Sequence, residues 1–204
     1  EMYCKYEYNR FFDSFEHYYS LYHHRNLELW AEYADGKVTK EELNRQRYLY
    51  PLKAVGICDS ALAKAYEKDA LAAIPTKSKL MPHAREVLEY LSSKYNLYII
   101  SNGFKELQSH KMHSSGIDKY FKKIVLSDDI GVLKPWPEIF YFALSATQSE
   151  LKDSLMIGDS WENDIAGAAG VGMHQVFYNL SGRMDLPFMP TYQISDLTEL
   201  LDLL

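Results

Sequence analysis

The chain has 204 residues, of which 47% are hydrophobic, and a formal net charge of −6 at pH 7. This length and apolar content suffice for one substantial core with a smaller appendage. No window approaches the roughly 20 apolar residues of a membrane span, so we expect a soluble protein without a membrane partner. The acidic balance argues against binding of nucleic-acid polymers and is compatible with a single nucleotide as a small phosphorylated substrate.

Cysteine usage and the N-terminal residues bear on the cellular compartment. Cys4 and Cys58 are too few for a disulfide framework or a zinc site. No signal peptide is visible, which favours the reducing cytoplasm as the location. The sequence leaves open whether the protein is a monomer or a homodimer.

The first part of the chain, residues 1–78, is predicted to be a helical domain that is unusually rich in Tyr and Phe. Thr39 followed by Glu42 is typical of a capping box, which sets the start of one helix. The predicted helices are one through Trp30 that ends at a turn at Asp35–Gly36, one over residues 40–50 that breaks at Pro51, and one over residues 59–72.

The second part, residues 79–204, is predicted to be an α/β domain with a Rossmann-like parallel sheet. Strands alternate with helices, which is the order typical of parallel strands joined by crossover helices. The predicted helices cover residues 82–94, 105–115, 137–147, 161–170 and 197–203, and the predicted strands end at Ser101 or cover residues 124–127, 155–159, 174–178 and 192–194.

Ser101, Asn102 and Gly103 follow an apolar, β-branched strand. The Ser101 hydroxyl and the backbone amides of Asn102 and Gly103 are hydrogen-bond donors, and a glycine lets the backbone approach a ligand closely. Such a strand end can hold a phosphate group. Taken alone, however, an ordinary turn explains these three residues better.

Lys134 precedes Pro135 and a helix that is predicted to begin near Pro137. Proline favours an extended backbone at the preceding residue and so directs the chain into that helix. Lysines are usually solvated. A lysine located between a phosphate-holding turn and a pair of carboxylates can instead offset the charge on a phosphoryl group.

Asp159 and Asp164 follow the apolar run Leu155–Gly158 at a strand-to-helix junction. Asp159 is expected at the carboxyl end of a strand, where open α/β sheets bind ligands. Mg²⁺ takes oxygen ligands and typically only one or two protein carboxylates, so the pair predicts a magnesium site. The alternative is that Asp159 or Ser160 caps the helix and that Asp164 complements the helix dipole.

In this order, the three motifs resemble the second, third and fourth motifs of the haloacid dehalogenase (HAD) superfamily in its phosphatase form, over about residues 79–204. The resemblance implies hydrolysis of a phosphomonoester through an aspartyl-phosphate, with Mg²⁺ as the cofactor. It implies that Ser101 and Asn102 form the phosphate-binding catalytic motif and that Lys134 stabilises the nucleophile and the phosphate. Asp159 would ligate Mg²⁺, and Asp164 would support the metal directly or through water.

The first motif of the superfamily, an apolar strand ending in two aspartates two residues apart, is not found in these 204 residues. Asp13 has no second aspartate at position 15 and is interpreted as a helix cap. We therefore expect the nucleophile on a strand upstream of Glu1, within roughly 15 to 35 further residues. That strand is expected to run between the strands that end at Ser101 and Asp159. If Met2 is the natural start, the chain is instead a non-catalytic relative.

The helical domain has the place of the mobile cap of the superfamily, and the resemblance implies that it selects the substrate. The pattern around Trp30, Arg47 and Phe104 looks like the pyrimidine 5'-nucleotidase branch, which removes phosphate from pyrimidine nucleoside monophosphates. We expect these three residues and Gly103 to contact the substrate. Most of the Tyr and Phe rings are expected to form a core rather than a stacking surface for a base.

Three functions therefore compete. A magnesium-dependent nucleotide phosphatase is favoured by Asp159 and Asp164. A 2-haloacid dehalogenase shares the fold, the serine and the lysine but needs no metal, and the acidic pair disfavours it. A non-catalytic binding protein on the same scaffold stays open because the chain contains no nucleophile motif.

Overall fold

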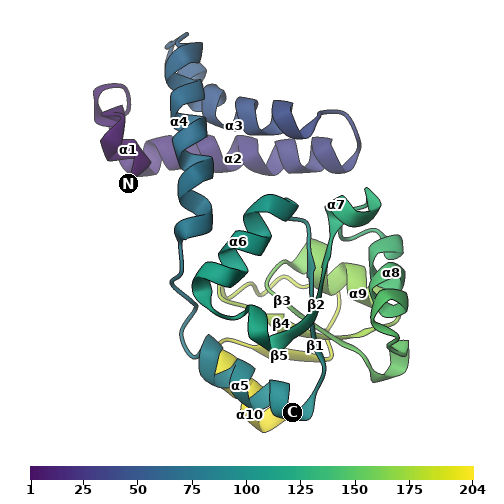
Figure 1. Ribbon diagram of the computed structural model, residues 1–204. Coiled ribbons are helices and arrows are strands. Elements are labelled where there is room, and N and C mark those ends of the chain that lie inside the picture. The colour runs from purple at the N-terminus through teal and green to yellow at the C-terminus, as the bar shows by residue number, and fades with distance from the viewer. The chain divides into compact units, whose positions relative to one another are not determined.

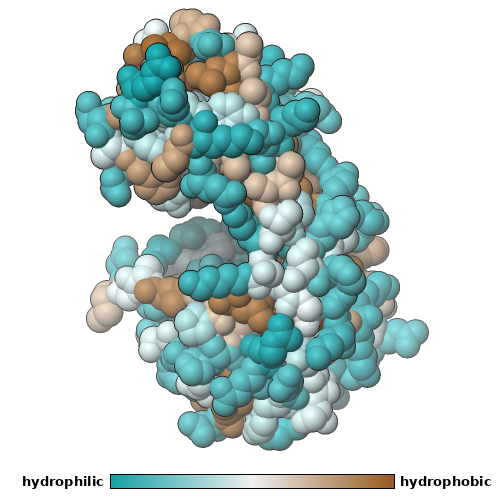
Figure 2. Space-filling view, turned by 60° about the vertical axis from the view of Figure 1, so that its left-hand side comes forward, coloured by the Kyte–Doolittle hydropathy of each residue, from teal (hydrophilic) through white to brown (hydrophobic).

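The computed structural model describes residues 1–204, which form two compact units, Glu1–Thr76 and Lys77–Leu204 (Figure 1). Each unit has its own hydrophobic core. No helix is both long enough and apolar enough to cross a membrane. On the face shown in Figure 2, hydrophobic residues form separate patches among hydrophilic ones.

The first unit is entirely helical. Its three long helices are α2 (Phe15–Ala34), α3 (Lys40–Ala54) and α4 (Ser60–Ala73). Short turns connect them, and α3 contacts both α2 and α4. The turn between α2 and α3 contains Gly36, whose φ of 68° is a backbone conformation that glycine adopts without strain. The helices are α1 (Met2–Lys5), η1 (Tyr8–Arg10), α2 (Phe15–Ala34), α3 (Lys40–Ala54), α4 (Ser60–Ala73) and η2 (Ile74–Thr76).

Polar side chains begin the long helices. The predicted capping box is confirmed, because Glu42 N donates to Thr39 Oγ1 at 3.2 Å and Thr39 N donates to Glu42 Oε2 at 2.9 Å. The interpretation of Asp13 as a helix cap is wrong, since Ser14 is the N-cap of α2 and accepts from His17 N at 3.1 Å. The cap must directly precede the first helical residue to reach the free N–H groups of the first turn.

Proline does not end the second long helix. The predicted break at Pro51 is wrong, because α3 continues to Ala54. A proline inside a helix removes the hydrogen bond to the carbonyl four residues earlier, which here is that of Arg47. Pro51 and Leu52 are fully buried, and the burial of this apolar turn offsets the lost hydrogen bond.

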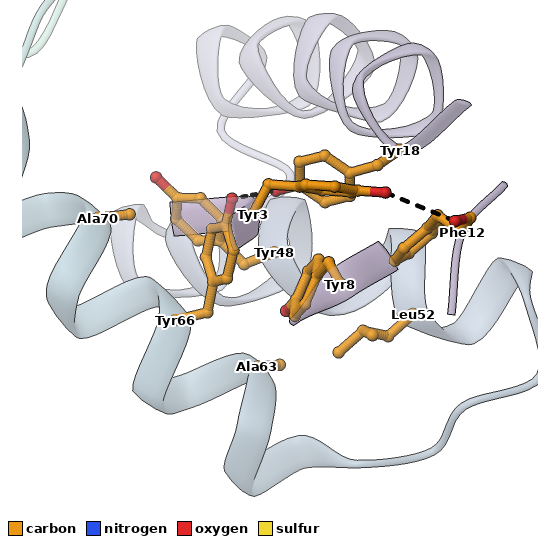
Figure 3. Close-up of a cluster of buried hydrophobic side chains, with 9 residues drawn as sticks. All are labelled: Tyr3, Tyr8, Phe12, Tyr18, Tyr48, Leu52, Ala63, Tyr66 and Ala70. Carbon is orange, nitrogen blue, oxygen red and sulfur yellow. Dashed lines mark hydrogen bonds between the residues drawn. The ribbon is translucent and has the colours of Figure 1, made fainter. Parts of the chain in front are cut away.

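The aromatic residues of the first unit pack on one another to form its core (Figure 3). The rings of Tyr8 and Tyr66 stack with their centroids 4.7 Å apart, and Tyr18 Oη donates to Tyr66 Oη at 2.9 Å. Burial raises the pKa of the Tyr18 hydroxyl far above its usual range, so this hydroxyl keeps its proton and can donate. Most of the rings therefore serve as core, as predicted.

The second unit contains parallel strands in two groups. β1 (Leu97–Ser101) pairs with β2 (Phe121–Leu126). β3 (Leu155–Gly158), β4 (His174–Tyr178) and β5 (Tyr192–Ile194) form the second group in that order, and every pairing is parallel. Because helices connect these parallel strands, the predicted α/β class with a Rossmann-like core is confirmed.

The helices of the second unit alternate with its strands. Ser127 starts α7 instead of ending the preceding strand, where it was predicted. The helical elements are α5 (Ala84–Lys94), α6 (Lys105–Ser115), η3 (Asp118–Tyr120), α7 (Ser127–Ile130), α8 (Pro137–Thr147), η4 (Leu151–Asp153), η5 (Trp161–Ala166), α9 (Gly167–Gly170), η6 (Leu197–Glu199) and α10 (Leu200–Leu203).

The helix after β3 differs from a regular α-helix in its first part. The predicted α-helix over residues 161–170 begins as the π-helical segment η5, Trp161–Ala166, and only then becomes α9. The carbonyl of Ser160 accepts from both Asp164 N at 2.9 Å and Ile165 N at 3.2 Å. This shared acceptor widens the first turn, a distortion that is frequent at functional sites.

Helices cover both faces of the strands. On one face, α8 and α9 pack around Phe140 together with Ile100 of β1 and Met156 of β3. On the other face, α5 and α10 pack around Val176 of β4 together with Ile157 of β3. Neighbouring residues of β3 thus enter different cores, because successive side chains of a strand point to opposite faces.

β1 and β3 each pair with a neighbouring strand on one edge only. Their residues are half-buried along the whole strand, whereas the central residues of β4, which has two neighbours, are buried. An unpaired strand edge presents N–H and C=O groups that can pair with a further strand. The two strands that carry the predicted site at their carboxyl ends therefore each have an open edge.

Close packing at the start of α9 predicts a cost for any side chain at Gly167. A Cβ atom there would lie 2.8 Å from Phe140 Cε2 and 3.0 Å from Pro135 Cα. We expect Gly167→Ala to lower the free energy of unfolding by about 1–3 kcal/mol. Gly170→Ala is the control, because no atom lies within 4 Å of its Cβ position. Equal urea midpoints for the two variants would contradict the packing described here.

Candidate active site

The centre of the candidate site is the amine of Lys134. Lys134 Nζ donates to the carbonyl oxygen of Ile100 in β1 at 2.9 Å and to Asp164 Oδ1 in η5 at 2.6 Å. The side chains of Lys134 and Asp164 are only 10% and 7% exposed. The amine therefore links the end of β1 to the helical segment after β3, and three segments distant in the sequence meet at one point.

Asn102 holds the backbone of the same lysine. Its Nδ2 donates to the Lys134 carbonyl at 2.9 Å, and Lys134 N donates to Asn102 Oδ1 at 2.7 Å. The paired bonds use the amide as both donor and acceptor, which an aspartate at this position would not do. Asn102 is thus a structural partner of the lysine loop.

Asp164 is fully engaged within the protein. Besides Lys134, it accepts from Ser160 N through Oδ2 at 3.1 Å. Gly158 gives this carboxylate its space, since a Cβ there would lie 2.5 Å from Asp164 Cγ. Each carboxylate oxygen therefore already has a donor. This favours support of a metal site through water over direct ligation by Asp164.

Asp159 has no hydrogen-bond or ion-pair partner, and its residue is exposed directly after β3. Ser160, not Asp159, caps the following helix, with its Oγ accepting from Asn163 N at 3.3 Å. The Asp159 carboxylate is therefore available to a ligand. A hard divalent cation such as Mg²⁺ fits this oxygen donor, since it usually takes one or two protein carboxylates and keeps several waters. The chain contains no cluster of three or more His, Cys, Asp or Glu residues able to hold a metal alone.

The turn after β1 differs in detail from the predicted phosphate cradle. The sequence predicted that the amide of Gly103 donates to a phosphate group. In the structure this amide donates to Ser101 Oγ at 3.0 Å instead. Gln108 Nε2 donates to the same oxygen at 3.1 Å. Phe104 follows as the N-cap residue of α6 and is buried. Gln108 was missed in the sequence, because a glutamine one turn into a helix carries no signal of its own.

The remaining predicted site residues lie in the first unit. Trp30, on α2, packs its ring 5.9 Å from that of Tyr33. Arg47, on α3, is 6% exposed, and its guanidinium lies 5.0 Å from the centre of the Tyr48 ring. Its Nε has no hydrogen-bond partner, and neither has Oδ1 of the buried Asn44. Asn102, Lys134 and Asp164 are joined by contacts, and Ser101 directly precedes Asn102 in the chain, whereas Trp30 and Arg47 belong to the other unit.

Known proteins resemble this chain over most of its length. The family model for haloacid dehalogenase-like hydrolases matches residues 4–172. The HAD-hydrolase YfnB of Bacillus subtilis is 31% identical over 182 residues, which are 88% of this chain and 76% of that protein. The pyrimidine 5'-nucleotidase YjjG of Escherichia coli is 32% identical over 181 residues, which are 88% of this chain and 79% of that protein.

Solved structures agree with these relationships. The crystal structure of YfnB bound to magnesium has a TM-score of 0.80 at 29% identity and covers 91% of this chain and 81% of its own. A 2-haloacid dehalogenase from Pseudomonas syringae has a TM-score of 0.63 at 25% identity and covers 93% of this chain and 80% of its own.

The buried ion pair predicts that removing one partner lowers the free energy of unfolding more than removing both. Lys134→Met leaves the Asp164 carboxylate buried without a cation, and we expect a loss of about 3–5 kcal/mol in the free energy of unfolding. Adding Asp164→Asn removes the orphaned charge and should restore part of that loss, which urea unfolding of the single and double variants measures.

Lys105→Met is the matched control for this prediction. Its exposed amine also pairs with a carboxylate, Asp129, at 2.9 Å, but solvent screens that pair, so stability should change far less. Additive losses at Lys134 and Asp164 would contradict the described coupling.

Proposed function

The chain belongs to the haloacid dehalogenase-like hydrolase family, and we propose that it is a magnesium-dependent phosphatase of pyrimidine nucleoside 5'-monophosphates. The observation that carries the proposal is the unpaired Asp159 carboxylate on the rim where Lys134 joins the end of β1 to Asp164. A cation-binding oxygen, a fixed ammonium group and a hydroxyl together suit a phosphoryl group.

Each residue of the rim has a role in the proposed reaction. Ser101 donates a hydrogen bond from its hydroxyl to a phosphoryl oxygen, and Lys134 offsets negative charge on the phosphate and on the attacking carboxylate. Asp159 would ligate Mg²⁺, which neutralises phosphate charge when bound. Asp164 keeps the lysine amine in place and supports the metal site through water.

We propose that the nucleophile is an aspartate on a strand that precedes Glu1 in the full-length protein. Its oxygen forms a bond to phosphorus while the ester bond to the nucleoside breaks, and a second carboxyl group protonates the leaving oxygen. Water then attacks the aspartyl-phosphate and releases inorganic phosphate. The open edges of β1 and β3 support a parallel strand between them, which would bring its carboxyl end beside Ser101 and Asp159.

The relatives and the first unit support the proposed substrate class. YjjG, 32% identical to this chain, is a pyrimidine 5'-nucleotidase. We propose that the helical unit acts as a cap that selects the nucleoside, with Trp30, Arg47, Phe104 and Gly103 in contact with the substrate. The buried and unpartnered Arg47 Nε provides a donor that a base or sugar oxygen can use.

A 2-haloacid dehalogenase is the second candidate, favoured by the similarity to the Pseudomonas syringae structure. A dehalogenase needs no metal, and an unpaired carboxylate such as Asp159 would repel the departing halide. A non-catalytic binding protein is the third candidate. Phosphate release with and without Mg²⁺ separates all three.

The proposed activity predicts a metal-dependent turnover that needs Asp159. Full-length protein should release inorganic phosphate from pyrimidine nucleoside monophosphates in the presence of Mg²⁺ and lose this activity with a chelator. Asp159→Ala should lower kcat/KM by at least about 100-fold, because a metal ligand is removed. Asp153→Ala, at an exposed aspartate of η4, is the matched control and should behave like the wild type.

Two results would reject parts of this proposal. Metal-independent release of halide from 2-haloacids, without phosphate release, would favour the dehalogenase. Full Mg²⁺-dependent turnover by Asp159→Ala would reject the metal assignment.

The proposed nucleophile predicts a particular sequence upstream of Glu1. The native reading frame should encode an apolar strand that ends in two aspartates two residues apart, within roughly 15 to 35 residues. DNA sequencing of the gene tests this directly. A start codon at Met2 would remove the nucleophile and leave only a binding function.

A further inference from the structure

We propose that Gln108 is a positioning residue that makes the Ser101 hydroxyl an obligatory hydrogen-bond donor to the phosphoryl group. The proposal rests on the proposed phosphatase function and extends it to a residue outside the sequence motifs. Gln108 lies in the first part of α6, where its backbone N donates to the Phe104 carbonyl at 3.0 Å. Its side chain turns back to the end of β1, and Nε2 donates to Ser101 Oγ at 3.1 Å.

The hydroxyl of Ser101 accepts two hydrogen bonds. Besides Gln108, the backbone N of Gly103 donates to Ser101 Oγ at 3.0 Å. A serine hydroxyl has two lone pairs and one proton. Both lone pairs are thus occupied, and no residue of the protein accepts the proton. The hydroxyl can therefore only donate to a ligand, and it selects an atom that accepts hydrogen bonds, such as an anionic phosphoryl oxygen.

Gly103 is explained by the same arrangement. Its φ is not positive, so no unusual backbone conformation requires glycine here. A Cβ at this position would instead lie 2.8 Å from Gln108 Cδ and 2.9 Å from Cγ. The glycine therefore leaves the space through which the Gln108 amide reaches Ser101. Any larger residue would push the amide away from the hydroxyl.

The neutrality of the Gln108 side chain matters as much as its length. A neutral amide donates to Ser101 without adding charge beside an anionic substrate. A glutamate has nearly the same shape but only accepts hydrogen bonds when ionised. It would accept the hydrogen bond from the Ser101 hydroxyl and repel the phosphate. The substitution Gln108→Glu thus reverses the polarity of the hydroxyl while preserving the side-chain volume.

The test measures phosphate recognition in the full-length protein. Gln108→Glu should raise both KM for the nucleotide and Kd for inorganic phosphate, measured directly by titration calorimetry, by about tenfold or more, since a charge-assisted hydrogen bond is lost. Gln193→Glu is the matched control, because it adds the same charge at an exposed position of β5, the outer strand of its group. It should leave both constants within about twofold of the wild type, as expected for a screened surface charge.

A double-mutant cycle separates positioning from a merely structural role. Gln108 acts through the Ser101 hydroxyl, so in a Ser101→Ala background Gln108→Glu should retain only the repulsive part of its effect, and Gln108→Met should have no further effect on Kd for inorganic phosphate. Thermal unfolding should show Tm values near that of the wild type for Gln108→Met. In the protein that keeps Ser101, by contrast, Gln108→Met should weaken the binding of inorganic phosphate.

The proposal is overturned if Gln108→Glu binds inorganic phosphate like the wild type, because the amide would then accept from Ser101 rather than donate to it. It is also overturned if Gln108→Met weakens phosphate binding equally with and without the Ser101 hydroxyl. Should Gln108→Glu fail to fold, the Gln108→Met cycle decides alone. Binding of inorganic phosphate needs no turnover, so absence of nucleotidase activity would reject the proposed function without obscuring this test.

Discussion

The two hydrogen bonds of the Lys134 amine, to the Ile100 carbonyl and to the Asp164 carboxylate, hold the site together. They connect the end of β1 with the segment after β3, although these strands are not paired. Removing an ammonium group and a carboxylate from water is unfavourable unless both are well paired. Here the paired groups also accept or donate further bonds, so a nearly buried charge pair becomes a stable anchor.

The two aspartates, Asp159 and Asp164, have different roles around this anchor. Asp164 is satisfied by Lys134 and by the amide of Ser160, and Gly158 leaves it room. Ser160 also caps the helix, so Asp159 is not needed as a cap and its carboxylate stays free. Two carboxylates five residues apart thus have different environments, one internal and structural, the other open to a ligand.

Glycine serves the site by its small size rather than by its backbone freedom. Side chains at Gly103 and Gly158 would collide with Gln108 and Asp164 respectively. Each glycine precedes a helical segment whose polar residue turns back toward the end of the preceding strand. The same arrangement therefore occurs twice: Gln108 hydrogen-bonds to the Ser101 hydroxyl, and Asp164 hydrogen-bonds to the Lys134 amine.

The aromatic residues of the first unit show that composition alone does not decide the role of a side chain. Its many rings could have formed either a core or an exposed stacking surface, and packing decides for the core, with Tyr8, Tyr18 and Tyr66 in mutual contact. Pro51 shows the opposite limit. A local rule predicted a break, but the burial of the helix end outweighed one lost hydrogen bond.

Local chemistry, read from the sequence alone, determined the fold class, the order of the motifs, the capping box at Thr39 and the membership in a hydrolase family. These features depend on neighbouring residues and on periodicity, which a sequence displays directly. Only the tertiary structure decided that Asp164 pairs with Lys134 and that Gln108 reaches Ser101. Those contacts depend on side-chain directions and on distances between segments that are far apart along the chain, and no local pattern encodes them.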